Sequence, residues 1–260
     1  AMCGITGYHS DDPRARAALP LMTGALAHRG PDADGFHFDG PVGLGHRRLA
    51  VIDLALSRQP LVSSDGGIAV VFNGEIYNFR ALRRELAAAG HVFVTMGDGE
   101  VLVHGWKAWG PRLLERIAGM FAFALWDRAR RELFLARDHL GVKPFHYAWH
   151  AGALAFGSEL KALRAGPGAA WKGEVDRDAL ALYLSLAYLP SPEAIYAGVR
   201  KLPPGCRVEI RPQQPGQLPA PQPFWSVRAV ASEGARHRQF ASQHAPRVVQ
   251  AEVLECAVGE

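Results

Sequence analysis

A cysteine, Cys3, lies almost at the start of the chain and is followed by Gly4. A cysteine at a processed terminus can use its own α-amino group as a base. That amine has a pKa of ~7.7–8.0, so it can accept the thiol proton directly or through one water. Threonine and other terminal nucleophiles use the same arrangement. The alternative interpretation is a small buried hydrophobic residue in a first strand, which is the usual role of an isolated cysteine.

The motif Asn73-Gly74-Glu75 follows residues 70–72, which are apolar and typical of a strand. Asn-Gly is the commonest hairpin pair, so a turn is one prediction. An oxyanion hole is the other, because a glycine N–H and an asparagine side-chain amide are suitable donors to a developing negative oxygen. The motif alone does not decide between the two.

Charged residues in several short motifs suit recognition of a small charged molecule. Arg47 and Arg48 are adjacent, and arginine binds carboxylates through two parallel hydrogen bonds. Residues 28–32 form a second charged cluster, and most clusters of this kind are solvated surface. Asp98 is most simply a helix N-cap, although it can also meet an ammonium group if the helix start faces a pocket. Arg137-Asp138 is interpreted as a structural ion pair under a turn.

Composition and motif searches exclude several other classes of protein. The 29 basic and 25 acidic residues give a net charge of only +4, which does not indicate a nucleic-acid partner. No apolar stretch reaches the ~20 residues of a membrane span, and no secretory signal is visible, so we expect no membrane partner. Three widely spaced cysteines fit neither a disulfide framework nor a four-cysteine zinc site, and they favour a reducing cytoplasm. We expect no metal and no cofactor in this domain.

Alternating strands and helices must position these residues. Helix-like patterns occur at residues 14–28, which Pro20 disturbs, at 78–90 with Asn78 as cap and Gly90 as stop, at 98–110, and at 159–164. Strand patterns occur at residues 5–8, 43–53, 68–73, 120–127, 132–138, 145–149 and 154–157. Short strands separated by turn residues are typical of an antiparallel sheet, and helices must cover it. We therefore predict a layered α+β domain over about residues 3–165.

The remainder of the chain has a different character. Residues 176–189 form an amphipathic helix capped by Asp176, and residues 201–211 read as a turn and a strand. Residues 212–223 are rich in Pro and Gln, which is typical of a linker or an exposed loop. Residues 226–260 are weakly helical and have no stop signal.

Taken together, the motifs resemble one family. They are, in chain order, Met2-Cys3-Gly4-Ile5, His28-Arg29-Gly30-Pro31-Asp32 with Gly35, His46-Arg47-Arg48-Leu49 through Asp53, Gln59-Pro60, Asn73-Gly74-Glu75-Ile76-Tyr77-Asn78, Gly97-Asp98-Gly99-Glu100, Gly119-Met120-Phe121-Ala122-Phe123-Ala124, and Arg137-Asp138 with Gly141 to Pro144. This set resembles the glutaminase domain of glutamine-hydrolysing asparagine synthetases, a class II glutamine amidotransferase. The resemblance covers about residues 2–165 and continues more loosely through residues 202–205 and 224–225.

The resemblance implies an N-terminal-nucleophile hydrolase fold, in which two antiparallel sheets pack between helix layers in an αββα sandwich. It implies that Cys3 attacks the glutamine amide to form a γ-glutamyl thioester, with Asn73 and the Gly74 N–H as oxyanion donors. It further implies that Arg48 binds the glutamine α-carboxylate and Asp98 its α-ammonium. Glu75, Leu49 and Val51 would help shape the pocket. Arg47 is the runner-up for the carboxylate.

The resemblance also implies an organisation and partners. Ala1 looks like a cloning remnant ahead of the initiator Met2; with both residues present, the Cys3 amine is lost and we expect little hydrolysis. Residues 3–165 would be the glutaminase domain, 166–225 its extension, and 226–260 a linker to an ATP-dependent synthetase domain. That domain would be the partner in the same polypeptide and would use ATP and Mg²⁺. The oligomeric state stays open, with a homodimer as one option.

Three functional interpretations follow. The first is a glutaminase that supplies ammonia to an asparagine synthetase-type domain, with an alternative in which the acceptor is not aspartate. The second is a glutaminase fold that has lost catalysis and acts as a scaffold. The third is hydrolysis of another amide. The joint presence of Cys3, Arg48, Asn73, Gly74 and Asp98 favours the first, because Arg48 and Asp98 match the two charges of a free amino acid.

Overall fold

The computed structural model describes residues 3–50, 57–150, 152–166, 173–211 and 220–232. The chain divides into two compact units, Ala1–Phe224 and Trp225–Glu260. The first unit carries every strand that the structure describes, and in the second residues 227–232 are helical. None of the helices in the described ranges is long and apolar enough to cross a membrane.

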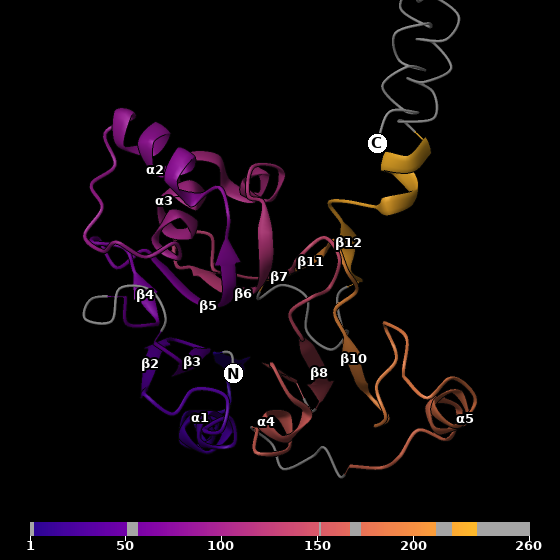
Figure 1. Ribbon diagram of the computed structural model, residues 1–260. Helices are drawn as coiled ribbons and strands as arrows, with labels where there is room; N and C mark the ends of the chain where they lie inside the picture. Colours follow the sequence, from indigo (N-terminus) through magenta and orange to yellow (C-terminus); the bar gives the residue numbers. More distant parts are fainter. Residues whose placement is uncertain (1–2, 51–56, 151, 167–172, 212–219, 233–260) are drawn as a thin grey trace, which may run out of the picture. The chain divides into compact units, whose positions relative to one another are not determined.

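Two sheets form the centre of the first unit, and every strand pair within them is antiparallel (Figure 1). The first sheet has the spatial order β10 (Val199–Lys201), β8 (His146–His150), β9 (Ala153–Gly157), β1 (Gly4–His9), β3 (Val42–Arg48), β2 (Ala33–Asp39). The second has the order β12 (Gln222–Pro223), β11 (Cys206–Ile210), β7 (Glu132–Arg137), β6 (Gly119–Asp127), β5 (Ile68–Ile76), β4 (Leu61–Val62).

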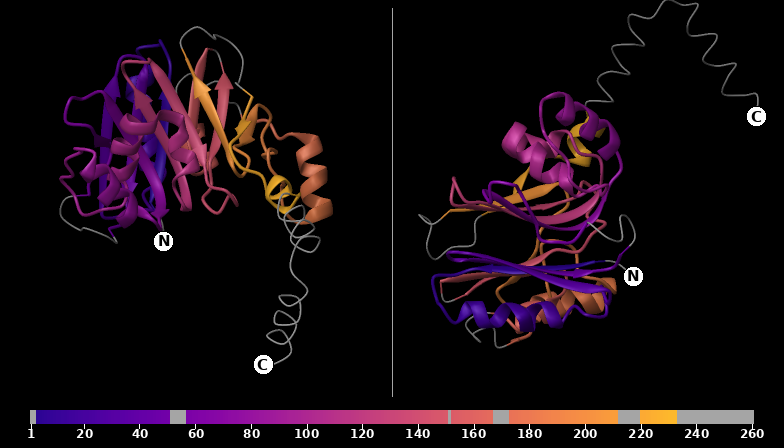
Figure 2. Two further views of the ribbon diagram at one scale, coloured as in Figure 1. Left: turned by 90° about the horizontal axis from the view of Figure 1, so that it is seen from above. Right: turned by 90° about the vertical axis from the view of Figure 1, so that its left-hand side faces the viewer.

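Helices cover the outer face of each sheet, so that the first unit has four layers (Figure 2). Helices α1 (Ala15–Gly24) and α4 (Leu160–Arg164) pack on the first sheet. Helices α2 (Phe79–Ala88) and α3 (Glu100–Trp109), with the 3₁₀ helix η1 (Gly110–Glu115), pack on the second. The predicted αββα arrangement is therefore the observed one.

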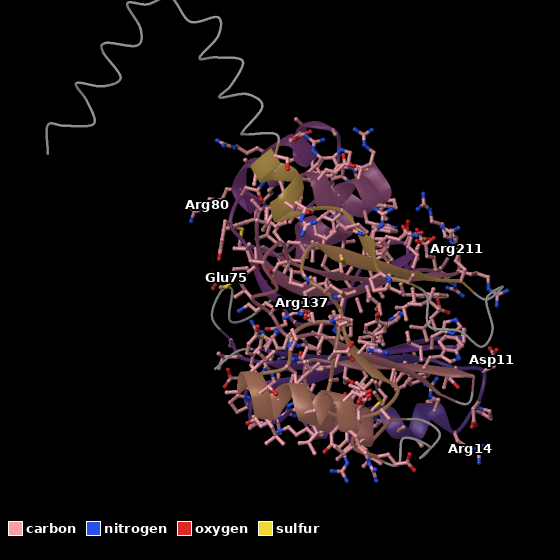
Figure 3. The ribbon with its side chains drawn as sticks, turned by 90° about the vertical axis from the view of Figure 1, so that its right-hand side faces the viewer. Asp11, Arg14, Glu75, Arg80, Arg137 and Arg211 are labelled. Atoms are coloured by element: carbon pink, nitrogen blue, oxygen red, sulfur yellow. The ribbon has the colours of Figure 1, made fainter. Side chains whose placement is uncertain are left out.

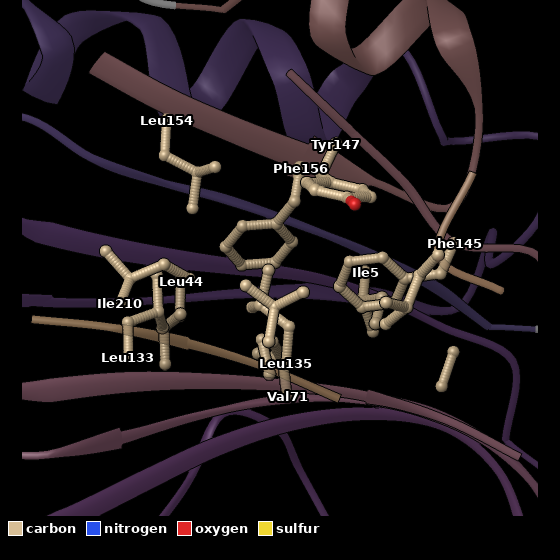
Figure 4. Packing of buried hydrophobic residues seen from close by; sticks show 14 of the residues in the cluster. Ile5, Leu44, Val71, Leu133, Leu135, Phe145, Tyr147, Leu154, Phe156 and Ile210 are labelled. Carbon is tan, nitrogen blue, oxygen red and sulfur yellow. The ribbon is translucent and has the colours of Figure 1, made fainter. Parts of the chain in front are cut away.

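The core between the sheets follows from the two-residue alternation of strands. Ile5, Leu44 and Phe156 project from the first sheet and meet Val71 and Leu135 from the second (Figure 4). All five side chains are fully buried. A second cluster lies on the other face of the second sheet, under α2 and α3. Because β5 and β6 are apolar on both faces, they can be buried on both.

Most predicted elements are confirmed, with shifted ends. The predicted strands over residues 120–127, 132–138, 145–149 and 154–157 are β6, β7, β8 and β9. The predicted strand over 43–53 is β3, and its residues 51–53 lie outside the described residues. Strands β2 and β4 were not predicted. The predicted linker over 212–223 is wrong at its end, because β12 pairs with β11; residues 212–219 lie outside the described part of the chain.

The predicted helix ends had mixed outcomes. Asp176 caps α5 (Arg177–Leu186), since its carboxylate accepts hydrogen bonds from the N–H groups of Asp178 and Ala179. Gly90 follows α2 with a left-handed φ of 94° that favours glycine. Asn78 occupies the predicted N-cap position of α2, but its side chain makes no capping hydrogen bond. The Asn78 side chain instead donates to the Arg116 carbonyl at 2.8 Å and accepts from the Ala118 N–H at 2.9 Å, which ties the start of α2 to the entry of β6.

Candidate active site

A pocket lies where the end of β3 meets the edge of β5, and segments from both sheets line it. Cys3 and Leu49 come from the first sheet and its loop, and Asn73 and Gly74 come from β5. The lining residues are Cys3, Arg48, Leu49, Ser57, Gln59, Leu61, Phe72, Asn73, Gly74, Glu75, Thr95, Gly97, Asp98, Gly99, Glu100 and Lys143.

Cys3 precedes β1 directly, and its thiol is held against the end of β3. Its Sγ donates to the Leu49 carbonyl at 3.6 Å and accepts from the Leu49 N–H at 3.4 Å. The Arg29 Nε donates to the main-chain oxygen of Cys3 at 3.0 Å. The pKa of the Cys3 thiol is raised, because the effect of burial outweighs the Leu49 contact and the positive charges of Arg48, Arg29 and Lys143, which lower it. The thiol is thus partly buried, fixed at both its side chain and its main chain, and surrounded by cations.

The edge of β5 supplies main-chain donors to this pocket. Strand β4 pairs only with Ala69 and Val70, so beyond it the edge of β5 has no strand partner within the described part of the chain. Side chains take that place: Gln59 pairs with both main-chain groups of Phe72, at 2.6 and 3.0 Å, and Asp98 accepts from the Ile76 N–H at 2.8 Å. Because successive N–H groups of a strand alternate in direction, the Gly74 N–H lies on this same edge, between those two.

Asn73 and Gly74 continue the strand and form no turn. Asn73 pairs with Ala122 and Gly74 with Phe121 in an unbroken ladder with β6. The turn prediction is therefore wrong, and the reason is that nine ladder pairs outweigh the local preference of Asn-Gly. Asn73 is 1% exposed, and its Nδ2 has no hydrogen-bond partner among the described residues. It is a buried donor on the wall of the pocket that holds Cys3.

The two adjacent arginines lie in different surroundings, as strand alternation requires. Arg48 is 7% exposed and lines the pocket. Arg47 instead donates to the Gly30 carbonyl at 3.0 Å and pairs with Asp34 at 3.3 Å. The structure thus brings Arg48, and not Arg47, to the pocket.

Three carboxylates, Glu75, Asp98 and Glu100, also line the pocket. The prediction of Asp98 as the cap of α3 is wrong, because that helix begins after Gly99 and its cap position has no side-chain hydrogen bond. The pKa of Asp98 is raised, because burial and the charge of Glu75 outweigh the hydrogen bond from the Ile76 N–H. The Asp98 carboxylate thus contacts the edge of β5 and lines the pocket, where a bound cation would be a favourable partner.

Seven of the eight sequence-predicted site residues line this one pocket, and the eighth, Val51, lies outside the described residues. Sequence reasoning missed Gln59, Arg29 and Lys143 as parts of the surroundings of Cys3. The motifs contain all three, but only the fold reveals what they contact. Across the described ranges, no group of three or more His, Cys, Asp or Glu side chains could hold a metal ion.

The loop that follows β7 is not held by the predicted Arg137-Asp138 ion pair. The Asp138 carboxylate accepts main-chain N–H groups from Phe121, Leu140, Val142 and Lys143, at 2.9–3.2 Å. Arg137 donates to main-chain oxygens of residues 141, 143 and 202, each at 2.7 Å. Each side chain satisfies main-chain groups of the loop separately, and in Figure 3 Arg137 lies between the two sheets.

Comparison with known proteins agrees with this geometry. A family model described as a glutamine amidotransferase domain matches residues 2–225. Asparagine synthetase [glutamine-hydrolyzing] 1 of Bacillus subtilis is 38% identical over 216 residues, which are 81% of this chain and 34% of that protein. Asparagine synthetase [glutamine-hydrolyzing] 3 of the same organism is 39% identical over 209 residues, which are 78% of this chain and 34% of that protein. The chain therefore spans about a third of the length of these relatives.

Solved structures share the fold. A glutamine phosphoribosylpyrophosphate amidotransferase from B. subtilis, complexed with ADP and GMP, matches with a TM-score of 0.58 at 22% identity, over 84% of this chain and 49% of that one. A structure described as the allosteric regulatory enzyme of purine biosynthesis matches with a TM-score of 0.62 at 21% identity, over the same shares. Together with the two antiparallel sheets between helices, these matches identify the chain as a member of the glutamine amidotransferase domain family, with an N-terminal-nucleophile hydrolase fold.

Proposed function

We propose that this domain hydrolyses L-glutamine to L-glutamate and ammonia, with Cys3 as the nucleophile. The observation that carries the proposal is the buried Asn73 Nδ2, a donor without a partner among the described residues, on the wall of the pocket that also holds Cys3. A buried amide donor left in this state is costly in an inert core and useful in an oxyanion hole. The neighbouring Gly74 N–H supplies the second donor.

The first half of the reaction forms an acyl-enzyme. The Cys3 Sγ attacks the side-chain carbonyl carbon of glutamine, and the thiol proton passes to the free α-amino group of Cys3. The carbonyl oxygen becomes an oxyanion, which the Asn73 Nδ2 and the Gly74 N–H stabilise. When the C–N bond breaks, the α-ammonium of Cys3 returns its proton to the leaving nitrogen. The products of this half are a γ-glutamyl thioester and ammonia.

The second half regenerates the thiol. A water attacks the thioester carbon and gives a proton to the same amine, and the oxyanion forms again between the same two donors. The C–S bond then breaks, the proton returns to the sulfur, and glutamate leaves. One amine thus serves as base and acid in turn, and water is the only co-reactant.

Pocket charges fit a free amino acid. Arg48 can bind the α-carboxylate through two charge-assisted hydrogen bonds, and Asp98 with Glu75 can bind the α-ammonium. This arrangement favours glutamine over a glutamine residue inside a peptide, which lacks both charges. Leu49 supports the site through its contacts with Sγ, and Val51 stays a prediction.

The wider role follows from the relatives and is part of the same proposal. We infer that the ammonia passes to a synthetase domain that amidates aspartate, which the names of the longer relatives support. We propose ATP and Mg²⁺ as the cofactors of that domain. The enzyme would then be a glutamine-hydrolysing asparagine synthase of the cytoplasm. A non-aspartate acceptor is distinguished by assaying the polypeptide that contains both parts with aspartate and with other carboxylates. A homodimer stays a prediction.

Glutamate release without ATP tests the glutaminase. A preparation with Cys3 as its first residue is compared with its Cys3→Ala and Asn73→Ala variants and with a preparation that retains Ala1-Met2. We expect no turnover from Cys3→Ala, and a kcat lower by about 10²–10³ from Asn73→Ala, as for loss of one oxyanion donor. Turnover that survives in Cys3→Ala refutes the proposal. Equal rates with and without Ala1-Met2 refute the amine as base.

A further inference from the structure

Lys143 is a cation that lines the pocket, and the sequence analysis did not identify it as a site residue. It lies in the loop between β7 and β8, is 5% exposed, and lines the pocket together with Cys3 and Glu75. Three positive side chains act on the Cys3 thiol, and they come from three different segments: Arg29 from the loop after α1, Arg48 from the end of β3, and Lys143. Buried lysines are rare, so this one needs a reason.

The main chain of the loop fixes the position of Lys143. Its N–H donates to Asp138 at 2.9 Å, and its carbonyl accepts from the Arg137 Nε at 2.7 Å. Asp138 and Arg137 together also bind main-chain groups of Leu140, Gly141 and Val142. Since these contacts involve only main-chain atoms of the loop, a substitution of the Lys143 side chain leaves them in place.

Lys143 offsets part of the negative charge of the pocket. Among the described residues, the lining carries three carboxylates, Glu75, Asp98 and Glu100, and two cations, Arg48 and Lys143. A zwitterionic glutamine adds one charge of each sign and leaves this difference unchanged. Without Lys143 the excess of carboxylates over cations would rise from one to two. The reaction places further negative charge on Sγ and on the tetrahedral oxygen, and an unbalanced carboxylate nearby opposes both.

The electrostatic couplings agree with this count. Burial lowers the pKa of Lys143, and Glu75 is the strongest charge that acts against burial. Lys143 in turn lowers the pKa of Cys3. Its ammonium therefore lies within the electrostatic range of both the proposed nucleophile and the carboxylate that would otherwise repel it.

We propose that Lys143 is an electrostatic residue of the glutaminase reaction, whose ammonium balances Glu75 and thereby stabilises negative charge on the Cys3 sulfur and on the oxyanion. The expected effect of Lys143 on kcat rests on the proposed function. Its expected effect on the reactivity of the Cys3 thiol does not depend on glutamine hydrolysis. Lys143 acts through its charge and takes no proton from the substrate.

The first test measures the thiol directly. Cys3 is alkylated with iodoacetamide at a series of pH values without glutamine, and peptide mass spectrometry separates Cys3 from Cys206 and Cys256. In Lys143→Met we expect the pH midpoint of alkylation to rise by about half a unit or more, because a nearby positive charge is lost. Lys143→Arg keeps the charge and should keep the midpoint. Lys143→Gln, which is neutral and polar, repeats the test if Met disturbs the loop.

The second test measures the reaction. We expect kcat at saturating glutamine to fall about tenfold in Lys143→Met and to recover largely in Lys143→Arg. Adding Glu75→Gln to Lys143→Met should restore part of the alkylation midpoint, since it removes the carboxylate that Lys143 balances. An unchanged midpoint in both neutral variants, or an equal shift in Lys143→Arg, overturns the inference. Failure of the glutaminase proposal is recognised separately, by turnover that persists in Cys3→Ala.

Discussion

Arg29 joins Cys3 to Glu159, since its Nε donates to the Cys3 carbonyl oxygen and its Nη1 donates to Glu159 Oε1, both at 3.0 Å. The same carboxylate contacts His28 at 2.9 Å and Lys161 at 3.2 Å. Arg29 therefore fixes the main chain of the proposed nucleophile, and Glu159, at the start of α4, fixes Arg29. The first sheet and its covering helix are thus coupled to the position of Cys3.

This coupling predicts how Glu159→Gln changes stability with pH. Burial raises the pKa of Glu159, but the hydrogen bonds from Arg29, His28 and Lys161 outweigh it and lower the pKa to about 2. Its contribution to folding is therefore present above the unfolded pKa of ~4.3 and is lost as the pH falls toward 2. We expect Glu159→Gln to lower Tm at pH 7 and to differ progressively less from the unaltered protein between pH 5 and pH 3.

Thermal unfolding in a buffer series measures this difference. Glu115→Gln is the control, because its pairing with Arg112 is between exposed side chains and such pairs contribute little. At pH 7 we also expect Glu159→Gln to lower kcat several-fold, since Arg29 would hold Cys3 less firmly. A Tm difference that stays constant down to pH 3 would contradict an ionic role for Glu159.

The fold was largely predictable from local patterns. Strands β6, β7, β8 and β9 alternate or run apolar between turn residues, so short-range sequence signals suffice for them. Strand β2 was missed because it is only half-buried and carries charged and polar side chains. Strand β4 was missed because two residues carry no pattern.

The candidate site was predictable only in part, for a different reason. Cys3, Asn73 and Asp98 belong to motifs, and motifs reveal residue types. They do not reveal that β4 is short, which leaves the edge of β5 to Gln59 and Asp98. The sequence pattern therefore predicted Asp98 as a helix cap, whereas its carboxylate accepts a hydrogen bond from the Ile76 N–H. Long-range contacts of this kind depend on the tertiary fold, which no local window contains.

The two adjacent arginines allow a matched pair of substitutions. Arg48→Gln removes one of the two cations that line the pocket, whereas Arg47→Gln removes contacts with Gly30 and Asp34. A charge-assisted hydrogen-bond pair contributes about 1.5–3 kcal/mol, so we expect Arg48→Gln to raise KM for glutamine by about 10- to 150-fold. Arg47→Gln should lower Tm and leave KM within about twofold. Steady-state kinetics and Tm of both variants show which arginine binds the α-carboxylate of glutamine. The opposite pattern would assign that role to Arg47.

Gly74 leaves no room for a side chain. A Cβ at this position would lie 2.1 Å from the Met120 carbonyl oxygen and 2.7 Å from the Phe121 Cα, both main-chain atoms of β6. Gly74→Ala must therefore push β5 away from β6 and move the proposed oxyanion N–H. We expect a kcat lower by at least about tenfold together with a lower Tm. Gly24→Ala is the control, since nothing lies within 4 Å of its Cβ. Normal kcat in Gly74→Ala would show that this N–H is not a donor.

His46 offers a test of the buried layer behind the pocket. The ring is 1% exposed on β3, it lies near the Phe72 carbonyl, and neither nitrogen has a hydrogen-bond partner among the described residues. Burial, together with the charges of Arg48 and Arg47, lowers the pKa of His46 to about 3, although the Phe72 carbonyl acts in the opposite direction. The imidazole is therefore neutral in the folded protein at every pH at which the enzyme would work.

The pH dependence of stability follows from that neutral state. In the unfolded chain His46 takes a proton below pH ~6.5, whereas in the folded protein it does so only near pH 3. Over that window the unfolded state binds more protons, so the contribution of His46 to stability is present above pH 6.5 and falls by up to about 1.4 kcal/mol per pH unit as the pH decreases. His46→Leu removes this loss without leaving a buried polar group unpaired. We expect its Tm to decline less between pH 6 and pH 4 than that of the unaltered protein, measured by calorimetry in matched buffers. Parallel Tm curves over that range would mean that His46 is protonated in the folded state or is hydrated there.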